Sequence, residues 1–318
     1  MNIRTVLTLA AAALLLAVIS FWMGQQAYSW FPPQASAESK LVDDLFSFLV
    51  TLGSFIFLGV TGTILYSVLF QRAGKYDFSD GPPIEGNITL EVVWTAVPLV
   101  LVIWIAAYSY QIYDQMAVRG PMELVHLHLP MGMESAYAAP TEPDSAAVAD
   151  PLEAIEVHAK QWSWVFRYPE QDVTSTELHL PVDRRVRLML ESEDVIHGFY
   201  IPAFRLKQDV IPNHVIDFEF TPIRTGKYRL RDSLYSGTYF AAMQTDVVVQ
   251  SPEDYRQWLA DAAAQTPTVA YNQAAFEYQR IIDKALIRGW KSIPPAPAPV
   301  VNYPGIGSRA DEGLDSEK

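Results

Sequence analysis

Two uncharged apolar runs, residues 45–70 and 92–113, limit the fold of this chain more than any other feature. Each is at least as long as the roughly 20 residues that an α-helix needs to cross a bilayer. The short connection between them carries Arg72 and Lys75. Because basic loops stay in the cytoplasm, we expect this connection to lie inside and everything after Asp114 to lie outside. The sequence therefore predicts a transmembrane helical hairpin over residues 38–114.

The N-terminal segment, residues 1–37, has two interpretations that stay open. Arg4 precedes an apolar run at residues 5–23, which is typical of a signal peptide or of a membrane helix. The triplet at residues 35–37, Ala-Ser-Ala, resembles a processing site, but it lies well beyond the apolar run. The run also exceeds the roughly 7–15 apolar residues of a typical signal. The side on which the large domain lies is the same in both cases.

Composition excludes several classes of function. The chain has 318 residues, 50% of them hydrophobic, and a net charge of −13, so the basic excess of a nucleic-acid-binding protein is missing. It has no cysteine. Structural disulfides, thiolate zinc sites, iron–sulfur clusters and thiolate-bridged copper are therefore excluded.

A linker rich in Ala, Pro and Glu follows at residues 115–151, and its segment 122–133 has the composition of a copper site. Imidazole and thioether groups suit copper. The candidate ligands are His126, His128, Met131 and Met133. The other interpretation is a short strand with alternating side chains followed by a loop.

Residues 152–250 have the pattern of a β domain. From Ile155 the chain alternates apolar and polar residues and is rich in aromatic and β-branched types. Short strands separated by Pro-containing turns predict a sandwich or barrel. The expected strands are one or two within residues 155–168, then 176–180, 186–192, 214–221, 226–231 and 245–250.

Residues 251–292 are expected to be helical, because Ser251 is a suitable N-cap and Pro252 suits the first helical position. A second helical stretch is expected over residues 270–290. The tail, residues 293–318, is Pro-rich and then charged, which is typical of disorder.

Three motifs, in this order after the hairpin, resemble subunit II of haem-copper terminal oxidases. They are Q-W-S-W-V-F-R-Y-P-E at 161–170, S-E-D-V-I-H at 192–197 and R-L-K-Q-D-V-I-P at 205–212. The resemblance implies a membrane α-helical hairpin followed by an all-β cupredoxin-like sandwich and short C-terminal helices. It also implies a non-catalytic subunit of a proton-pumping oxidase that reduces oxygen to water. Subunits I and III would be its partners, and subunit I would hold the haems and CuB.

In the cytochrome c oxidase branch of this family the β domain holds a dinuclear CuA centre, bridged by two thiolates. By resemblance, this chain keeps His197 and Met243 among the ligand positions. The other positions carry Asp232 and Ser236 for the thiolates, Leu234 for a Glu and Phe240 for the second His. Because the chain has no bridging sulfur, we expect no CuA and no cofactor in this chain. His197 is then a hydrogen-bonded histidine near the domain surface, and Met243 is a packing residue. The alternative is one copper held by His197, Asp232 and Met243.

The pattern Y-S-G-x-x-F-x-x-M at residues 235–243 is similar to the quinol-oxidising branch, which also lacks CuA. The chain as a whole looks most like the CuA-less subunit II of cyanobacterial alternative respiratory oxidases. This resemblance implies that quinol supplies the electrons. Two alternatives remain: cytochrome c or a small copper protein docks directly, or the chain is a membrane-tethered copper-binding module.

Two further residues have roles implied by the resemblance. Glu91, at the start of the second hairpin helix, matches the carboxylate at the cytoplasmic mouth of a proton path; the alternative is a Glu favoured by the helix dipole. Trp162 matches the tryptophan through which cytochrome c electrons reach the domain. Since no CuA lies behind it, we expect Trp162 to pack, with Trp164 on the same face of a strand.

Overall fold

The computed structural model describes residues 2–72, 76, 86–116, 153–265, 272–282 and 291–295. The chain forms two compact units: one comprises Met1–Pro32 and Lys40–Met116, the other Pro33–Ser39 and Ala117–Lys318. Lys75, the candidate ligands in 122–133 and most of the linker and tail lie outside the described residues. The two units are described separately below.

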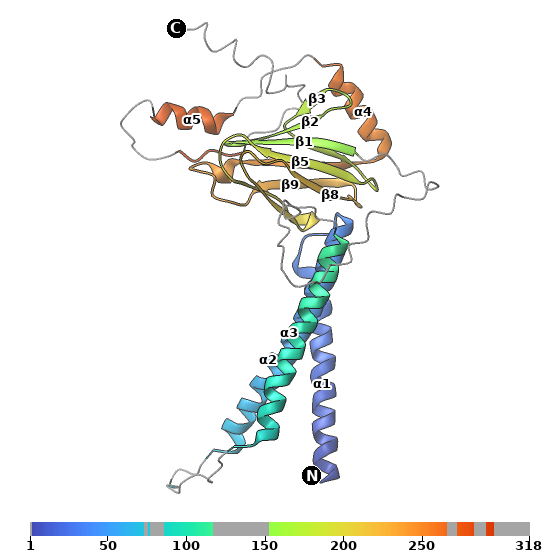
Figure 1. The fold of residues 1–318 in the computed structure, drawn as a ribbon, viewed down its shortest axis with the longest axis vertical. Coiled ribbons are helices and arrows are strands. Elements are labelled where there is room, and N and C mark those ends of the chain that lie inside the picture. The colour runs from blue at the N-terminus through green and yellow to red at the C-terminus, as the bar shows by residue number, and fades with distance from the viewer. Residues whose placement is uncertain are drawn as a thin grey trace, which may run out of the picture. The chain divides into compact units, whose positions relative to one another are not determined.

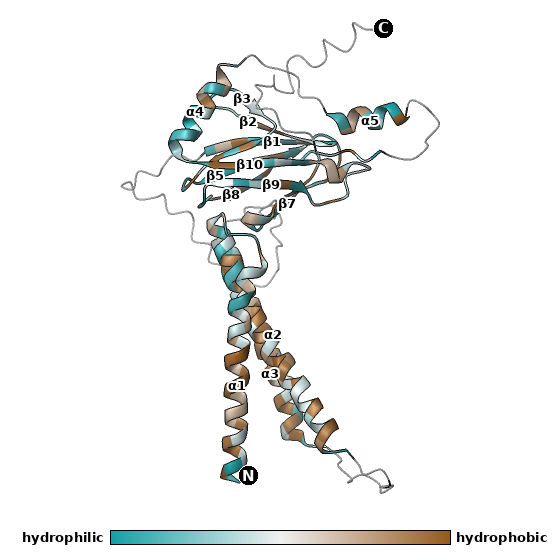
Figure 2. Cartoon of the chain, turned by 180° about the vertical axis from the view of Figure 1, so that it is seen from behind, coloured by the Kyte–Doolittle hydropathy of each residue, from teal (hydrophilic) through white to brown (hydrophobic). Residues whose placement is uncertain are grey.

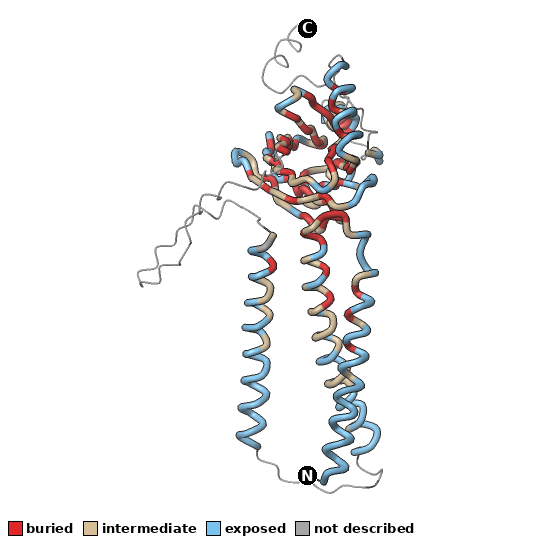
Figure 3. The backbone as a smooth tube through the Cα atoms, turned by 90° about the vertical axis from the view of Figure 1, so that its right-hand side faces the viewer, coloured by how far each residue is buried: buried red, intermediate tan, exposed pale blue. Residues whose placement is uncertain are grey.

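Three helices of the first unit are long and apolar enough to cross a membrane (Figure 2): α1 (Ile3–Ala27), α2 (Ala37–Phe70) and α3 (Ile88–Gln115). Asn87 caps α3, since its side chain accepts a hydrogen bond from the Leu90 N–H at 3.2 Å. Figure 3 shows that the three helices are largely exposed, as lipid-facing helices must be. The predicted helical hairpin is confirmed, and the chain is a membrane protein with its large C-terminal domain outside.

Helix α1 packs on α2 through small residues. Gly24 and Ala27 are buried, and Ser47 Oγ donates to the Gly24 carbonyl at 2.9 Å. A Cβ at Gly24 would lie 2.8 Å from the Ser47 carbonyl oxygen. Tyr28 extends the contact by donating its hydroxyl to Asp44 at 2.6 Å. Close small-residue packing of this kind is typical of membrane helices, which favours the membrane-helix interpretation of residues 5–23.

The second unit is a sandwich of two five-stranded sheets (Figure 1), in the orders β3-β2-β1-β5-β8 and β4-β10-β9-β6-β7. The strands pair antiparallel except β1 with β5 and β4 with β10, which are parallel. The strands are β1 (Glu153–Lys160), β2 (Ser163–Tyr168), β3 (Val173–Ser175), β4 (Leu178–Pro181), β5 (Val186–Ser192), β6 (His197–Ile201), β7 (Leu206–Val210), β8 (Ile216–Phe220), β9 (Gly226–Asp232) and β10 (Gln244–Gln250).

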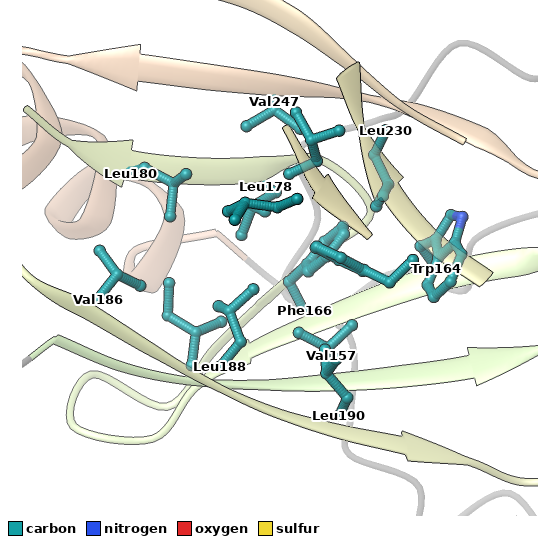
Figure 4. Close-up of a cluster of buried hydrophobic side chains, with 14 of the residues drawn as sticks. Val157, Trp164, Phe166, Leu178, Leu180, Val186, Leu188, Leu190, Leu230 and Val247 are labelled. Carbon is teal, nitrogen blue, oxygen red and sulfur yellow. The ribbon is translucent and has the colours of Figure 1, made fainter. Parts of the chain in front are cut away.

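Alternation along the strands builds the core between the sheets. β1 and β5 pair in register, with Ile155 opposite Leu188 and Val157 opposite Leu190, and all four side chains are fully buried. Figure 4 shows Trp164 and Phe166 of β2 among aliphatic side chains from both sheets. The predicted sandwich is therefore confirmed, and its core follows from the period of two.

The sequence pattern did not predict β6 and β7, which form a hairpin around the short turn Pro202–Phe204. Gly198 follows the first residue of β6, and Lys207, Gln208 and Asp209 give β7 a polar sequence. β7 lies at the edge of its sheet, where polar residues are tolerated because one side has no paired strand.

Helix α4 (Pro252–Ala263) begins as predicted, because Ser251 Oγ accepts from the Asp254 N–H at 3.1 Å. Its Tyr255 hydroxyl donates to Glu153 at 2.9 Å, and this carboxylate also pairs with Arg184 at 3.1 Å. Helix α5 (Gln273–Ile282) lies within the predicted second helical stretch. Both helices therefore belong to the outer domain.

Candidate functional site

His197, the first residue of β6, lies between two carboxylates. It is fully buried, which corrects the expectation of a histidine near the domain surface, because the two acids replace water as its hydrogen-bond partners. Its Nδ1 is 2.8 Å from Asp232 Oδ2, and its Nε2 is 2.9 Å from Asp194 Oδ1. Asp232 ends β9, the strand that pairs with β6, and Asp194 lies in the turn between β5 and β6. The sheet register and the turn together place both acids on one imidazole.

Asp232 is held as a charged carboxylate. Its Oδ1 accepts backbone N–H groups from Gly198 at 2.8 Å and from Leu234 at 3.0 Å. Burial alone would raise the pKa of Asp232, but the hydrogen bonds from His197 and these two amides, together with the Ser236 hydroxyl, outweigh it and lower the pKa. The Ser236 hydroxyl is buried and finds no partner in full hydrogen-bond geometry among the described residues.

The same contacts favour the protonated form of His197. Burial alone would lower its pKa, but the hydrogen bonds to Asp232 and Asp194 and the two negative charges outweigh it, so its pKa lies above the ordinary 6.5. Ionised carboxylates only accept hydrogen bonds, so both ring nitrogens must donate. The arrangement is a buried Asp–His–Asp chain, which we call the histidine clamp: Asp194, His197 and Asp232.

The donor set of the clamp does not fit the metal centre that the family resemblance implies. A dinuclear centre needs bridging thiolates, and the chain has no cysteine. A single metal bound to an imidazole nitrogen and a carboxylate oxygen would hold them roughly 3.3 Å apart in tetrahedral geometry. The Nδ1–Asp232 distance of 2.8 Å is that of a hydrogen bond. Among the described residues, no group of three or more His, Cys, Asp or Glu side chains is placed to hold a metal.

Three other positions compared with the copper ligands make contacts within the outer domain. Met243 is buried in the core, and its carbonyl accepts from the Asp232 N–H at 2.9 Å. Phe240 lies in a short 3-10 turn, partly buried, with its ring 5.4 Å from that of Tyr235. The Leu234 backbone N–H donates to Asp232 Oδ1.

Trp162 lies in the turn before β2, which corrects the expectation that it shares a strand face with Trp164. It is only 4% exposed, and its indole N–H donates to the Ser236 carbonyl at 3.1 Å. Its ring makes edge contacts with Tyr239, at 5.3 Å, and with Tyr278 of α5, at 5.1 Å. Trp162 thus connects the loop after β9 with the C-terminal helix.

Glu91 belongs to the first unit and lies in the exposed first turn of α3. Its backbone carbonyl accepts from the Thr95 hydroxyl at 2.8 Å. An acid in this position is stabilised by the helix dipole and remains accessible to water, so the geometry is compatible with both roles considered for Glu91.

Sequence reasoning missed Asp194 and the residues of α5 that cover Trp162. Asp194 stands three positions before His197 within S-E-D-V-I-H, and it also accepts the Gln161 N–H at 2.8 Å. The spacing of Asp194 and His197 is a signal that could have been used. Tyr278 carries no such signal, because its contact with Trp162 spans more than a hundred residues.

The comparisons with known proteins agree on one family. Residues 7–112 match the transmembrane domain of cytochrome c oxidase subunit II, and residues 170–251 match its periplasmic domain. Cytochrome c oxidase subunit 2 of Synechocystis is 36% identical over 270 residues, covering 79% of this chain and 80% of that protein. Quinol oxidase subunit 2 of Bacillus spizizenii is 25% identical over 240 residues, covering 74% and 65%. The solved periplasmic domain of cytochrome oxidase subunit II from Bradyrhizobium japonicum is 27% identical, with a TM-score of 0.33, over 34% of this chain and 91% of that one.

Proposed function

The chain belongs to the cytochrome c oxidase subunit II family, and we propose that it serves a proton-pumping terminal oxidase that is fed by quinol and has no CuA in this subunit. As a subunit II it is part of a haem-copper oxidase and associates with other oxidase subunits. Its haem and oxygen chemistry would reside in the partner subunit I, with subunit III completing the complex. This chain would stabilise subunit I and close its outer face.

The observation that carries the proposal is the histidine clamp. The position that holds a copper ligand in the copper-bearing branch carries a buried imidazolium, with both nitrogens donating to carboxylates at 2.8 and 2.9 Å. A metal ligand needs a free nitrogen lone pair, which a doubly donating ring does not have. The cation ties β6 to β9 and to the β5–β6 turn, so it can stabilise the domain without metal. The electron path would then bypass this domain.

The state of Trp162 supports quinol rather than a soluble electron donor. A docking residue must be reachable by the partner protein, yet Trp162 is 4% exposed and its indole N–H is engaged by Ser236. With quinol as donor, electrons enter through the membrane-embedded part of the complex. The outer domain then needs neither a docking tryptophan nor a copper acceptor.

Glu91 fits the proton side of the same proposal. It lies in the first turn of a membrane helix, at the boundary that we place on the cytoplasmic side. A carboxylate there exchanges protons with the cytoplasm and can pass them inward. We propose that it marks the mouth of a proton path into subunit I.

One observation favours a second candidate, cytochrome c oxidation without CuA. The Synechocystis relative, at 36% identity, is a cytochrome c oxidase subunit, whereas the Bacillus quinol oxidase subunit is 25% identical. In this candidate a soluble donor passes electrons directly to the haems of subunit I.

Steady-state oxygen uptake by the purified complex separates the two candidates. The complex is given either a reduced quinol or reduced cytochrome c, each with and without cyanide. We expect rapid cyanide-sensitive oxygen uptake with quinol and little with cytochrome c. Rapid cyanide-sensitive oxidation of cytochrome c would overturn the quinol proposal.

A further inference from the structure

The C-terminal part of this chain packs directly on Trp162. Asn272, the residue before α5, donates its side-chain amide to the Gln161 carbonyl at 3.3 Å and caps α5 by accepting the Ala275 N–H at 3.0 Å. Ala274 is 4% exposed and belongs to the hydrophobic core. With the Tyr278 ring against Trp162, the first turns of α5 are fixed by a cap, an apolar contact and an aromatic contact.

A half-buried ion cluster fixes the same segment further along. The Glu277 side chain is 10% exposed and pairs with Arg280 at 2.5 Å and with Lys291 at 3.9 Å. Lys291 lies beyond the end of α5, and Ile293 packs against the core. Residues 272–282 and 291–293 are thus held at several independent points, and together we call them the C-terminal cover.

Without the cover, the face beneath it would be suited to a protein partner. Trp162 and Tyr239 form an edge-to-face pair there, and Trp and Tyr are the residues most enriched at the energetic centres of protein interfaces. The pair adjoins Ser236, whose carbonyl takes the Trp162 N–H, and so adjoins the loop that carries the histidine clamp. The net charge of −13 would also attract a cationic protein from a distance.

We propose that the C-terminal cover excludes a folded, cationic, soluble redox protein from the Trp162 face. An α-helix with its side chains is about 10–12 Å across, so α5 holds an approaching protein about one helix diameter away from the indole. Attraction by net charge continues, but close contact does not form. This inference rests on the proposed function, because it names the structural element that keeps soluble donors out.

Two arginine substitutions at neighbouring positions of α5 test the cover in the full-length complex. Ala274→Arg places a long cation in the buried contact and displaces α5, whereas Gln273→Arg adds the same side chain at an exposed position. A chain that stops after Ala264 provides a variant without any cover. Hydroxyl-radical oxidation is measured at Trp162 by mass spectrometry and expressed relative to buried Trp164. Binding of reduced cytochrome c at low ionic strength is measured on the same samples.

We expect the Trp162 oxidation ratio to rise severalfold in Ala274→Arg and in the shortened chain, with a parallel severalfold gain in the affinity for reduced cytochrome c. Gln273→Arg should match the wild type in both measurements. The inference is overturned if Trp162 stays protected without the cover, if both arginine variants expose it equally, or if it becomes exposed with no gain in cytochrome c binding. The test of the cover compares each variant with the wild type. The test of the quinol proposal uses only oxygen uptake by the wild-type complex, so either proposal can fail without the other.

Discussion

Replacing Asp232 by Asn tests the histidine clamp most sharply. The amide keeps the size of the side chain and one oxygen that can accept from the Gly198 and Leu234 N–H groups, but it removes the charge that pairs with His197. A hydrogen bond to a charged group contributes about 1.5–3 kcal/mol. We expect the free energy of local opening of β6 and β9 to fall by this amount, which makes amide exchange there about ten to a hundred times faster.

The pH dependence of this difference follows from the two pKa shifts. The raised pKa of His197 gives a contribution that is fully present below pH 6.5 and is lost as the pH rises through the folded-state pKa. The lowered pKa of Asp232 gives a contribution to stability that is present above pH 3.8 and is lost as the pH falls through the folded-state pKa of Asp232. The difference between wild type and Asp232→Asn should therefore be largest between these two values and shrink at alkaline pH.

Hydrogen–deuterium exchange by mass spectrometry on the purified complex measures this prediction. Wild type and variant are compared at the same pH, so that the chemical exchange rate cancels. Asp209→Asn is the matched control, because Asp209 pairs with Lys207 on the exposed edge strand with both side chains about half exposed. Unchanged protection in Asp232→Asn, or a difference that grows with alkaline pH, would refute the clamp.

Three further substitutions have expected outcomes. Tyr255→Phe leaves one oxygen of buried Glu153 without its hydroxyl donor and should destabilise the outer domain by about 1 kcal/mol, seen as a lower melting temperature of the complex. Gly24→Leu puts a side chain against the Ser47 carbonyl and should separate α1 from α2 at a cost of about 1–3 kcal/mol, seen as lower stability in detergent. The intact mass of the wild-type chain should include α1. Glu91→Gln removes the exchangeable carboxyl and should slow oxygen turnover and proton pumping severalfold.

Each substitution has a control elsewhere in the chain. Tyr235→Phe removes a hydroxyl from a side chain that is 77% exposed and should be neutral. Gly53→Leu adds a leucine to α2 where a Cβ meets nothing within 4 Å. Asp114→Asn neutralises an exposed acid at the other end of α3 and should leave turnover unchanged. A mature chain that begins after Ala37 would contradict the retention of α1. Full proton pumping in Glu91→Gln would contradict the proton role of Glu91.

Local patterns predicted most of the fold. The membrane hairpin follows from length and hydropathy, and β5 was predicted over residues 186–192, as found, because its apolar residues alternate over the whole strand. The N-cap of α4 was also predicted, since Ser251 and Pro252 act on their immediate neighbours. β6 and β7 were missed because a glycine and a polar edge sequence hide the alternation.

The site was less predictable, because its contacts join distant parts of the chain. The family resemblance matched His197 and Asp232 to ligand positions of the copper-bearing branch, but their hydrogen bond depends on the pairing of β6 with β9. The α5 pattern predicts a helix, yet nothing in it shows that Tyr278 would cover Trp162. Long-range pairing and the docking of short helices are set by the whole domain, so single-sequence reasoning does not reach them.

Copper analysis of the complex with and without His197 tests the central claim most directly. The wild-type complex and the His197→Phe variant are grown with the same copper supply, and the copper-to-haem ratio of each is measured after purification. The histidine clamp predicts the same ratio in both, because His197 donates to Asp194 and Asp232 and binds no metal. A wild-type ratio that falls on substitution would show copper at His197 and contradict the account.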